Sequence, residues 1–246
     1  MTAFSDMTED HIISLLVHGT LPAVLVEGKD DMTAIRYLES KLGPTRATFI
    51  NCGCRKRLMN VYARREEFEN RSVVFLADLD TFVFTGVPLV YSEIIFTSGY
   101  SIENDVLPGS PIWQLFEVEE KNNYEQDLAE FLKWYSYEVE ECFAGRASNL
   151  ALHPNNVLRG PGRTFDAAVV TQRVYRRADD TTISYIAQNC LKLVRGHSLF
   201  ELIVYYLSSR HRESKYSKHN LLEISIKNNA SAWERTIISC LRARLA

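Results

Sequence analysis

The sequence contains no long hydrophobic run, and this absence removes two classes of protein at the outset. No apolar stretch approaches the roughly 20 residues that a membrane-spanning helix requires, so we expect no membrane association. The first residues, MTAFSDMTEDHIISLL, lack the basic start and the uninterrupted apolar segment of a secretory signal. We therefore expect a cytoplasmic protein.

Cysteine is also scarce, and its positions indicate neither a disulfide framework nor a zinc site. The chain has five cysteines, an odd number, at Cys52, Cys54, Cys142, Cys190 and Cys240. The Cys-Gly-Cys pair among them lacks CxxC spacing, no second pair completes it, and the histidines show no metal-ligand spacing. Reduced thiols, as in cytosolic proteins, are the simplest expectation.

Acidic residues are few toward the end of the chain. The small net charge of −3 is therefore the sum of an acidic part and a basic part. Residues 1–110 hold 15 acidic against 10 basic side chains (−5), 111–143 hold 9 against 2 (−7), and 144–246 hold 7 against 16 (+9). Such a division suits a metal-dependent enzyme that acts on a polyanion, with carboxylates for the ion and cations for the phosphates. The alternative is that these charges only solvate helix surfaces.

The hydrophobic pattern that is present predicts an α/β domain followed by a mainly helical domain. Short apolar runs alternate with helical patterns, which is typical of βαβ units and a largely parallel sheet. Strands are expected over 22–27, 46–51, 72–78 and 93–97, and helices over 8–18, 29–42 and 55–68. Later helices are expected over 122–143, 180–195, 197–210 and 230–244. The expected domains are 1–110 and 111–246, the second being basic from residue 144.

Two of the apolar runs end abruptly in carboxylates. Glu27 follows the run VLV, Asp31 lies four residues further on, and Asp78 and Asp80 follow the run VVFLA. Ligands of open parallel sheets bind beyond the carboxyl ends of the strands, and clustered carboxylates there need a cation, for which Mg²⁺ or Mn²⁺ is suited. This pattern predicts a metal site for phosphate chemistry. The alternative is that Glu27 and Asp31 cap a helix while Asp78 and Asp80 begin a turn.

Glu-Gly-x-x-Asp after one strand and Asp-x-Asp after a later one resemble the signature of the toprim family, which includes topoisomerases, primases and OLD-family nucleases. The resemblance implies a Rossmann-like parallel sheet with flanking helices. It also implies that Glu27 is the essential catalytic carboxylate and that Asp31, Asp78 and Asp80 join it in holding Mg²⁺ or Mn²⁺. Lys29, inside the first motif, would neutralise charge on the phosphate, or is a solvated residue of a helical first turn.

Three further motifs extend the resemblance over most of the chain: Tyr-Ser-Ile-Glu-Asn at 100–104, Asn-Cys-Gly-Cys-Arg-Lys at 51–56 and Arg-Gly-His-Ser-Leu-Phe at 195–200. Together they resemble the AriB effectors of the PARIS anti-phage defence system, which are toprim nucleases related to the OLD family. That resemblance implies a partner ABC-type ATPase (AriA-like) that holds the effector inactive until a phage trigger protein is sensed. The released effector would act as a homodimer and cleave host tRNA, with lysine tRNA as the expected target, causing translation arrest and abortive infection.

The roles of several single residues stay open. Glu103 matches the family's third acidic position and would complete a second metal site, or it stabilises the helix that follows. His197 is a catalytic acid or an RNA contact, or it packs against or caps its helix. The motif at 51–56 departs from the family's Gly-Gly-Lys, which leaves the roles of Arg55 and Lys56 uncertain.

Basic residues are the candidates for nucleic-acid contacts, with Tyr175 and Tyr216 placed to stack on bases. They are Arg55, Lys56, Arg173, Arg176, Arg177, His197, Arg210 and Arg212. The alternative for these residues is a set of solvated helix faces. The acidic helix expected over 122–143 would repel nucleic acid and is a candidate surface for a protein partner or the dimer mate.

Two other functions compete with a tRNA nuclease. One is an OLD-like toprim DNA nuclease or nickase, and the other is a catalytically silent adaptor of the ATPase. The full set of carboxylates argues against the adaptor. A topoisomerase is disfavoured because the chain lacks the additional domains and no tyrosine can be assigned as the attacking nucleophile.

Overall fold

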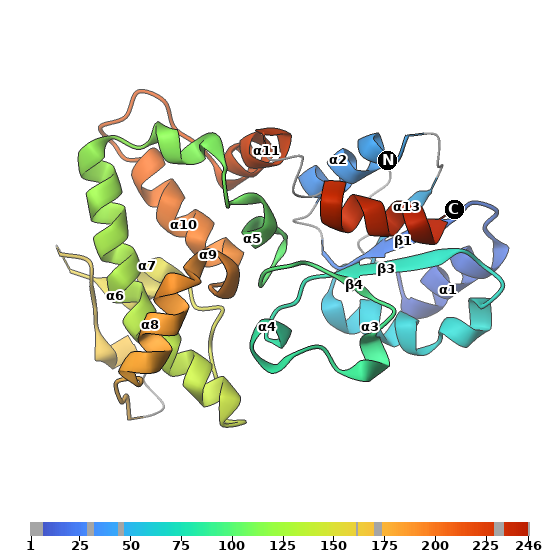
Figure 1. The fold of residues 1–246 in the computed structure, drawn as a ribbon, viewed down its shortest axis with the longest axis horizontal. Helices are drawn as coiled ribbons and strands as arrows, with labels where there is room; N and C mark the ends of the chain where they lie inside the picture. The colour runs from blue at the N-terminus through green and yellow to red at the C-terminus, as the bar shows by residue number, and fades with distance from the viewer. Residues whose placement is uncertain are drawn as a thin grey trace. The chain divides into compact units, whose positions relative to one another are not determined.

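The computed structural model of the chain describes residues 7–28, 32–43, 47–160, 162–169, 174–228 and 234–245 (Figure 1). The protein is α/β, with a four-stranded parallel sheet flanked by helices. Its contacts divide the chain into two compact units. The first comprises Met1–Leu79, Val87–Ser98 and Asn229–Ala246, and the second comprises Asp80–Gly86 and Gly99–Asn228.

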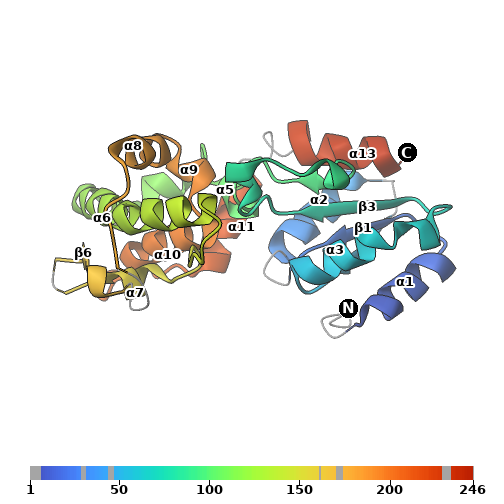
Figure 2. The same cartoon turned by 90° about the horizontal axis from the view of Figure 1, so that it is seen from below.

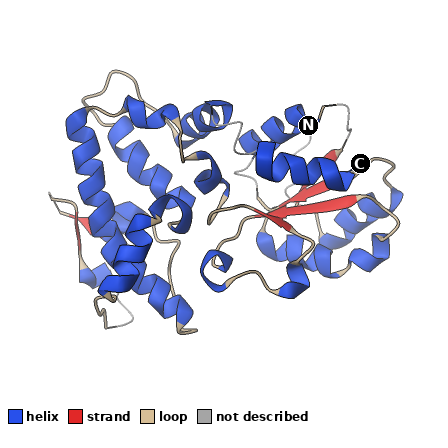
Figure 3. Cartoon of the chain, in the orientation of Figure 1, coloured by secondary structure: helices blue, strands red, loops and turns tan. Residues whose placement is uncertain are grey.

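The sheet of the first unit has the strand order β2-β1-β3-β4, and all of its neighbouring strands are parallel. Figure 3 draws strands in red and helices in blue. The strands are β1 (Ala23–Val26), β2 (Thr48–Asn51), β3 (Val73–Ala77) and β4 (Ile95–Phe96). Every residue of β1 is buried, as the continuous apolar run predicts for an inner strand of a parallel sheet. The strand expected over 93–97 is much shorter than predicted, since only two residues pair with β3.

The register of the sheet brings the two acid-terminated strands side by side. Val26 at the end of β1 pairs with Leu76 of β3 on one side and with Asn51 at the end of β2 on the other. Glu27 and Asp78, the residues that directly follow β1 and β3, therefore leave the sheet at the same edge and from neighbouring strands. This is the position at which parallel sheets bind their ligands.

Helices cover both faces of this sheet (Figure 2). Helices α1 (Glu9–His18) and α3 (Arg55–Ala63) lie on one face, and α2 (Met32–Leu42) and α13 (Ser239–Leu245) lie on the other. The crossover from β1 to β2 and the crossover from β2 to β3 run in opposite directions along the sheet. Right-handed connections therefore place α2 and α3 on opposite faces.

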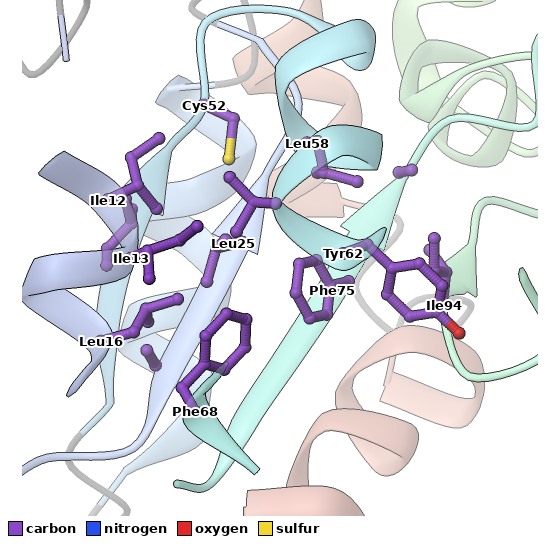
Figure 4. Close-up of a cluster of buried hydrophobic side chains, with 14 residues drawn as sticks. Ile12, Ile13, Leu16, Leu25, Cys52, Leu58, Tyr62, Phe68, Phe75 and Ile94 are labelled. Atoms are coloured by element: carbon purple, nitrogen blue, oxygen red, sulfur yellow. The ribbon is translucent and has the colours of Figure 1, made fainter. Parts of the chain in front are cut away.

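The core between the sheet and the α1/α3 layer is built from large apolar side chains (Figure 4). Ile12 and Leu16 of α1 meet Leu25 of β1, and the ring of Tyr62 of α3 packs edge-on against Phe75 of β3 with centroids 5.1 Å apart. As predicted, α1 begins after Thr8, whose side chain accepts a hydrogen bond from the backbone N–H of His11. This layer holds α3, and with it Arg55, against the sheet.

The second unit is built mainly of helices around the long helix α6 (Val118–Phe143), which contributes buried Phe131, Trp134 and Tyr135. A short antiparallel hairpin of β5 (Leu158–Arg159) and β6 (Thr164–Phe165) packs against α6. Within the described residues, the other α-helices of this unit are α4 (Phe82–Thr85), α5 (Ile102–Val106), α7 (Pro154–Val157), α8 (Asp180–Gln188), α9 (Cys190–Leu193), α10 (Gly196–Leu207) and α11 (Lys218–Asn228).

The observed units differ from the boundary expected at residue 110, most clearly at the end of the chain. A π-helical turn (Glu234–Ile238) and α13 form one segment whose buried Ile238 and Leu241 pack with the first unit. The Arg242 guanidinium also donates to the carbonyl oxygen of Lys41, with N and O 2.6 Å apart. The apolar face of this segment is thus buried with the sheet layer, and not in the helical unit.

Several helix boundaries also differ from prediction. The helix expected over 55–68 ends at Ala63 and is followed by a separate 3₁₀ helix, Arg65–Phe68. The helix expected over 180–195 is interrupted at Asn189, and α11 was not predicted. The first residues of the helix expected over 230–244, up to Trp233, are outside the described residues. In the part of the chain that the structure describes, no helix has both the length and the apolar character to span a membrane.

Candidate functional site

An arginine occupies the edge of the sheet at which the acid-terminated strands end. Arg55, the first residue of α3, has its Nη1 atom 3.4 Å from Oε2 of Glu27. The same nitrogen donates a hydrogen bond to the backbone carbonyl oxygen of Asp78, 2.6 Å away. Its guanidinium carbon lies 5.9 Å from the ring centroid of Phe96 in β4. One cation thus contacts the ends of three neighbouring strands.

The turn after β2 places Arg55 there. The Asn51 side chain accepts a hydrogen bond from the Gly53 backbone N–H (2.7 Å) and donates one to the Gly28 carbonyl oxygen (2.9 Å). Gly53 has a φ of 82°, a left-handed conformation that glycine adopts without a Cβ penalty. The motif at 51–56 therefore links the loops that follow β1 and β2. It also places Arg55, the first residue of α3, beside the Glu27 carboxylate.

Cys52 lies in the same turn, and its thiol is expected to be unreactive. It is fully buried, and this burial raises the pKa of its thiol to about 12. A thiol is a nucleophile only as thiolate. Cys52 is therefore a packing residue, and all five cysteines, each within the described residues, are free of disulfides.

The two acids of the Asp-x-Asp motif fall in different units. Asp78 directly follows β3 in the first unit, whereas Asp80 belongs to the second unit. Asp80 has a φ of 48°, which is uncommon for a residue with a side chain. Its backbone N–H donates to the carbonyl oxygen of Tyr100, 2.7 Å away. The chain thus passes from one unit to the other inside the motif, next to a residue in a left-handed conformation.

The donor chemistry beside Arg55 fits a divalent cation, although only part of the expected ligand set can be placed. Within the described ranges, no three His, Cys, Asp or Glu side chains gather as a metal site. Lys29 and Asp31 lie outside the described residues. Glu27 and Asp78 supply oxygen donors, and Mg²⁺ is commonly held by one or two carboxylates, water and substrate phosphate. The guanidinium beside Glu27 shows that this edge accommodates a cation.

Glu103 is held by protein groups on both carboxylate oxygens. The Lys218 ammonium lies 2.8 Å from Oε1, and the Ser101 hydroxyl donates to Oε2 at 2.6 Å. Burial alone would raise the pKa of Glu103, but the charge and hydrogen bond of Lys218 and the Ser101 hydrogen bond outweigh it and lower that pKa. Protein groups therefore already engage both oxygens of this carboxylate, and the second metal site expected at Glu103 stays a prediction.

Two of the sequence motifs, 100–104 and 195–200, meet in the second unit. The Asn104 side-chain amide donates to the carbonyl oxygens of Leu191 (2.8 Å) and Val194 (2.7 Å), just before α10 begins. A Cβ atom on Gly196 would lie 2.5 Å from the Ser101 hydroxyl oxygen, so only glycine permits this approach. The shared function of these motifs in the structure is to fasten α10 to α5.

His197 joins this arrangement through Lys218. Its Nδ1 atom lies 2.8 Å from the Lys218 ammonium, and its Nε2 atom lies 3.4 Å from Glu201. Burial and the neighbouring charges of Lys218 and Arg195 lower the pKa of His197. Glu201 also contacts His153, 3.0 Å away. The expected role of His197 as an RNA contact finds no support in this packing, which holds the ring inside an ionic network.

Three of the eight basic residues expected to bind nucleic acid are ion-paired with carboxylates within the second unit. Arg212 binds Glu120 of α6 with N–O distances of 2.7 and 2.6 Å, and Arg176 lies 2.6 Å from Glu140 of the same helix. Arg177 pairs with Asp180 at 2.5 Å. Carboxylates of α6 thus form ion pairs with arginines from the basic part of the chain after residue 144. Carboxylates pair with Arg176, Arg177 and Arg212 in the structure, and a nucleic-acid surface at these residues stays a prediction.

The other predicted contacts differ in exposure. Lys56 and Arg210 are exposed to solvent, and Arg173 lies outside the described residues. Sequence reasoning placed Arg55 in the nucleic-acid-binding set and missed its contact with Glu27. The only signal for that contact was the position of Arg55, directly after the turn that follows β2.

Comparison with known proteins adds no identification. No family model matches the chain, and no curated protein is detectably similar to it. The function is therefore inferred from the residues and their arrangement.

Proposed function

We propose that the protein is a metal-dependent phosphodiesterase of toprim type that cleaves RNA, with host tRNA as the favoured substrate. One observation carries the proposal. Glu27 and Asp78 leave neighbouring parallel strands at the same sheet edge, where a cationic side chain already lies 3.4 Å from Glu27. Carboxylates at this edge can ligate a divalent metal ion, and parallel sheets bind their ligands at this position.

Glu27 and Asp78 would hold Mg²⁺ or Mn²⁺, joined by Asp80 and Asp31 as the motif implies. When bound, the ion would stabilise charge on the phosphate and lower the pKa of a bound water. Glu27 is only 17% exposed and its backbone follows a fully buried strand, so its carboxylate is held in a fixed place for orienting the nucleophile. Lys29, by the same motif, would face the phosphate.

The resemblance to the AriB effectors supplies the biological setting of the proposal. In that setting an AriA-like ABC-type ATPase holds the protein inactive, and a phage trigger releases it as a homodimer. It then cleaves tRNA, lysine tRNA first, and translation stops. The cytoplasm is where all these partners occur.

The decisive experiment compares small-RNA ends in cells that express the protein with its genomic neighbours and are infected with phage. Wild type is compared with Glu27→Gln and with Glu69→Gln, an exposed acid of the first unit that serves as the matched control. New, discrete tRNA ends are expected in wild type and Glu69→Gln and absent in Glu27→Gln.

Each other outcome identifies a competing function. Intact tRNA in all three strains, with protection that still depends on Glu27, would move the substrate to DNA, as for an OLD-like nuclease or nickase. Protection that survives Glu27→Gln would leave only the silent adaptor of the ATPase.

A further inference from the structure

A cavity lies at the edge of the sheet opposite to Glu27. Its wall includes Leu15 of α1, Leu21 in the loop that leads into β1, and residues 48–50 of β2. Ala23, the first residue of β1, also lines the cavity, whereas Glu27 follows the last residue of that strand. The 4 residues of β1, at a rise of about 3.3 Å each, separate the two edges. The cavity is therefore distinct from the candidate functional site.

The cavity has the size and the lining of a small-molecule site. Its volume is about 310 Å³, at the lower end of the range for ligand pockets. An apolar cavity of about 150 Å³ is enough to hold benzene, so this one has room for a ligand of roughly twice that size. Leu15 and Leu21 are 46% and 51% exposed, so apolar side chains also border its opening. Predominantly apolar walls are typical of sites that bind small organic ligands.

Among the described residues that line this cavity, Arg71 is the only charged one. Its Nη2 atom lies 3.9 Å from the position that a Cβ atom on Gly19 would take, which places the guanidinium beside the loop after α1. The backbone N–H of Arg71 donates to the Phe68 carbonyl oxygen at 2.9 Å, so the base of the side chain is held in place. The wall thus combines apolar surface with one positive charge.

The guanidinium of Arg71 has no hydrogen bond or ion pair within the described part of the chain. Arg71 also borders a second cavity, which carries Glu66, Glu69 and Glu93. None of these three carboxylates pairs with Arg71, and Glu93 lies 3.3 Å from Arg65 instead. The donors of Arg71 are therefore free to bind an anionic group in the apolar cavity.

We propose that this cavity binds a small apolar carboxylate, with its hydrocarbon part between α1 and the sheet and its carboxylate on Arg71. A guanidinium binds a carboxylate through two parallel N–H···O bonds, and the Thr20 and Thr48 hydroxyls of the wall are further donors. A phosphate monoester carries about two negative charges and would keep one of them uncompensated beside a single cation. The inference goes beyond the proposed function, because it uses no residue at the Glu27 edge.

Octanoate is the probe, and octan-1-ol is its neutral counterpart with the same chain length. Isothermal titration calorimetry measures the affinity of each. Methionine-methyl NMR locates the binding, because Met7 lines the cavity whereas Met59 of α3 does not. Arg71→Met removes the charge and keeps an unbranched side chain. Arg36→Met, exposed on α2 and outside the cavity wall, is the matched control. Circular dichroism checks that each variant is folded.

Wild type and Arg36→Met are expected to bind octanoate about tenfold more tightly than octan-1-ol, and Arg71→Met is expected to lose that factor. Octanoate should shift the Met7 signal and leave the Met59 signal in place. Equal octanoate affinities of wild type and Arg71→Met, or an equal loss in Arg36→Met, would overturn the inference. An unchanged Met7 signal, or no octanoate binding by wild type, would overturn it as well. The proposed function is judged separately, by the tRNA experiment on Glu27.

Discussion

At the scale of single residues, His197 lies between the Lys218 ammonium and the Glu201 carboxylate. The Lys218 ammonium lies 2.8 Å from Glu103 on one side and 2.8 Å from Nδ1 of His197 on the other. An ammonium can only donate, so Nδ1 must accept, and the ring proton resides on Nε2, which faces Glu201. The arrangement therefore favours the neutral form of His197.

The lowered pKa of His197 predicts an acid-sensitive protein. Because the folded state binds this proton less readily than the unfolded chain, whose histidine pKa is about 6.5, unfolding gains protons and stability falls as pH drops below about 6.5. His197→Gln should flatten the dependence of the unfolding free energy on pH between about 6.5 and the folded-state pKa. Urea unfolding of both proteins at a series of pH values measures this. Parallel curves for the two proteins would contradict the assignment.

Single residues also show where sequence reasoning stops. The acids at the strand ends could be found because Glu27 and Asp78 each terminate an apolar run, and the sheet places those ends together. The partner of Glu103 could not be found, because Lys218 lies 115 residues away and no local pattern links the two. The contact of Arg55 with Glu27 is equally non-local and depends on the register of β1 and β2.

At the scale of elements, the packing of α10 against α5 predicts a severe effect of one added methyl group. In Gly196→Ala the new Cβ would lie 2.5 Å from Oγ of Ser101 and 2.6 Å from Cβ of Glu103, so a helix end has to shift. We expect a loss of about 1–3 kcal/mol in the free energy of unfolding, as for other overpacked sites. Chemical denaturation measures it.

Gly162→Ala is the matched control, because its Cβ would approach nothing closer than Thr164 at 3.9 Å. This variant should be neutral or slightly stabilising, since alanine restricts the unfolded chain. Equal stabilities of the two variants would show that α10 does not approach α5 as closely as described.

Helices and strands could be predicted where the spacing of apolar residues alone determines them. The buried strands β1 and β3 and the helices α1 and α6 follow from apolar spacing. The interruption between α8 and α9 does not, because the Asn189 side chain donates to the Tyr185 carbonyl oxygen 2.9 Å away and so competes with the backbone pattern of the helix. The last helix was predicted as an element, but its place on the sheet depends on tertiary packing.

At the scale of the whole molecule, the charge division along the chain is largely cancelled within the second unit. Arg212 is only 15% exposed and binds the Glu120 carboxylate through two nitrogens. Arg212→Ala should therefore cost about 1–3 kcal/mol of stability and leave RNA affinity nearly unchanged.

Arg210→Ala is the control, because Arg210 is exposed, and it should change the free energy of unfolding by less than about 0.5 kcal/mol. Chemical denaturation and RNA-binding titrations check both. A large loss of RNA affinity in Arg212→Ala without a loss of stability would restore the surface predicted from sequence.

The end of the chain completes the first unit, and a core substitution there distinguishes this assignment from a helical domain that runs to the C-terminus. Leu241 of α13 is fully buried, whereas its neighbour Cys240 is exposed on the same helix. Leu241→Ala should cost about 2–5 kcal/mol, as for other large-to-small core changes, and Cys240→Ala about 0.5 kcal/mol or less. Because α13 packs with β3, hydrogen exchange should show loss of amide protection in β3 in Leu241→Ala. Loss confined to α6 and α10 would instead place this helix in the second unit, as the sequence pattern had indicated. The sheet that carries Glu27 would then have to be stable without its last helix.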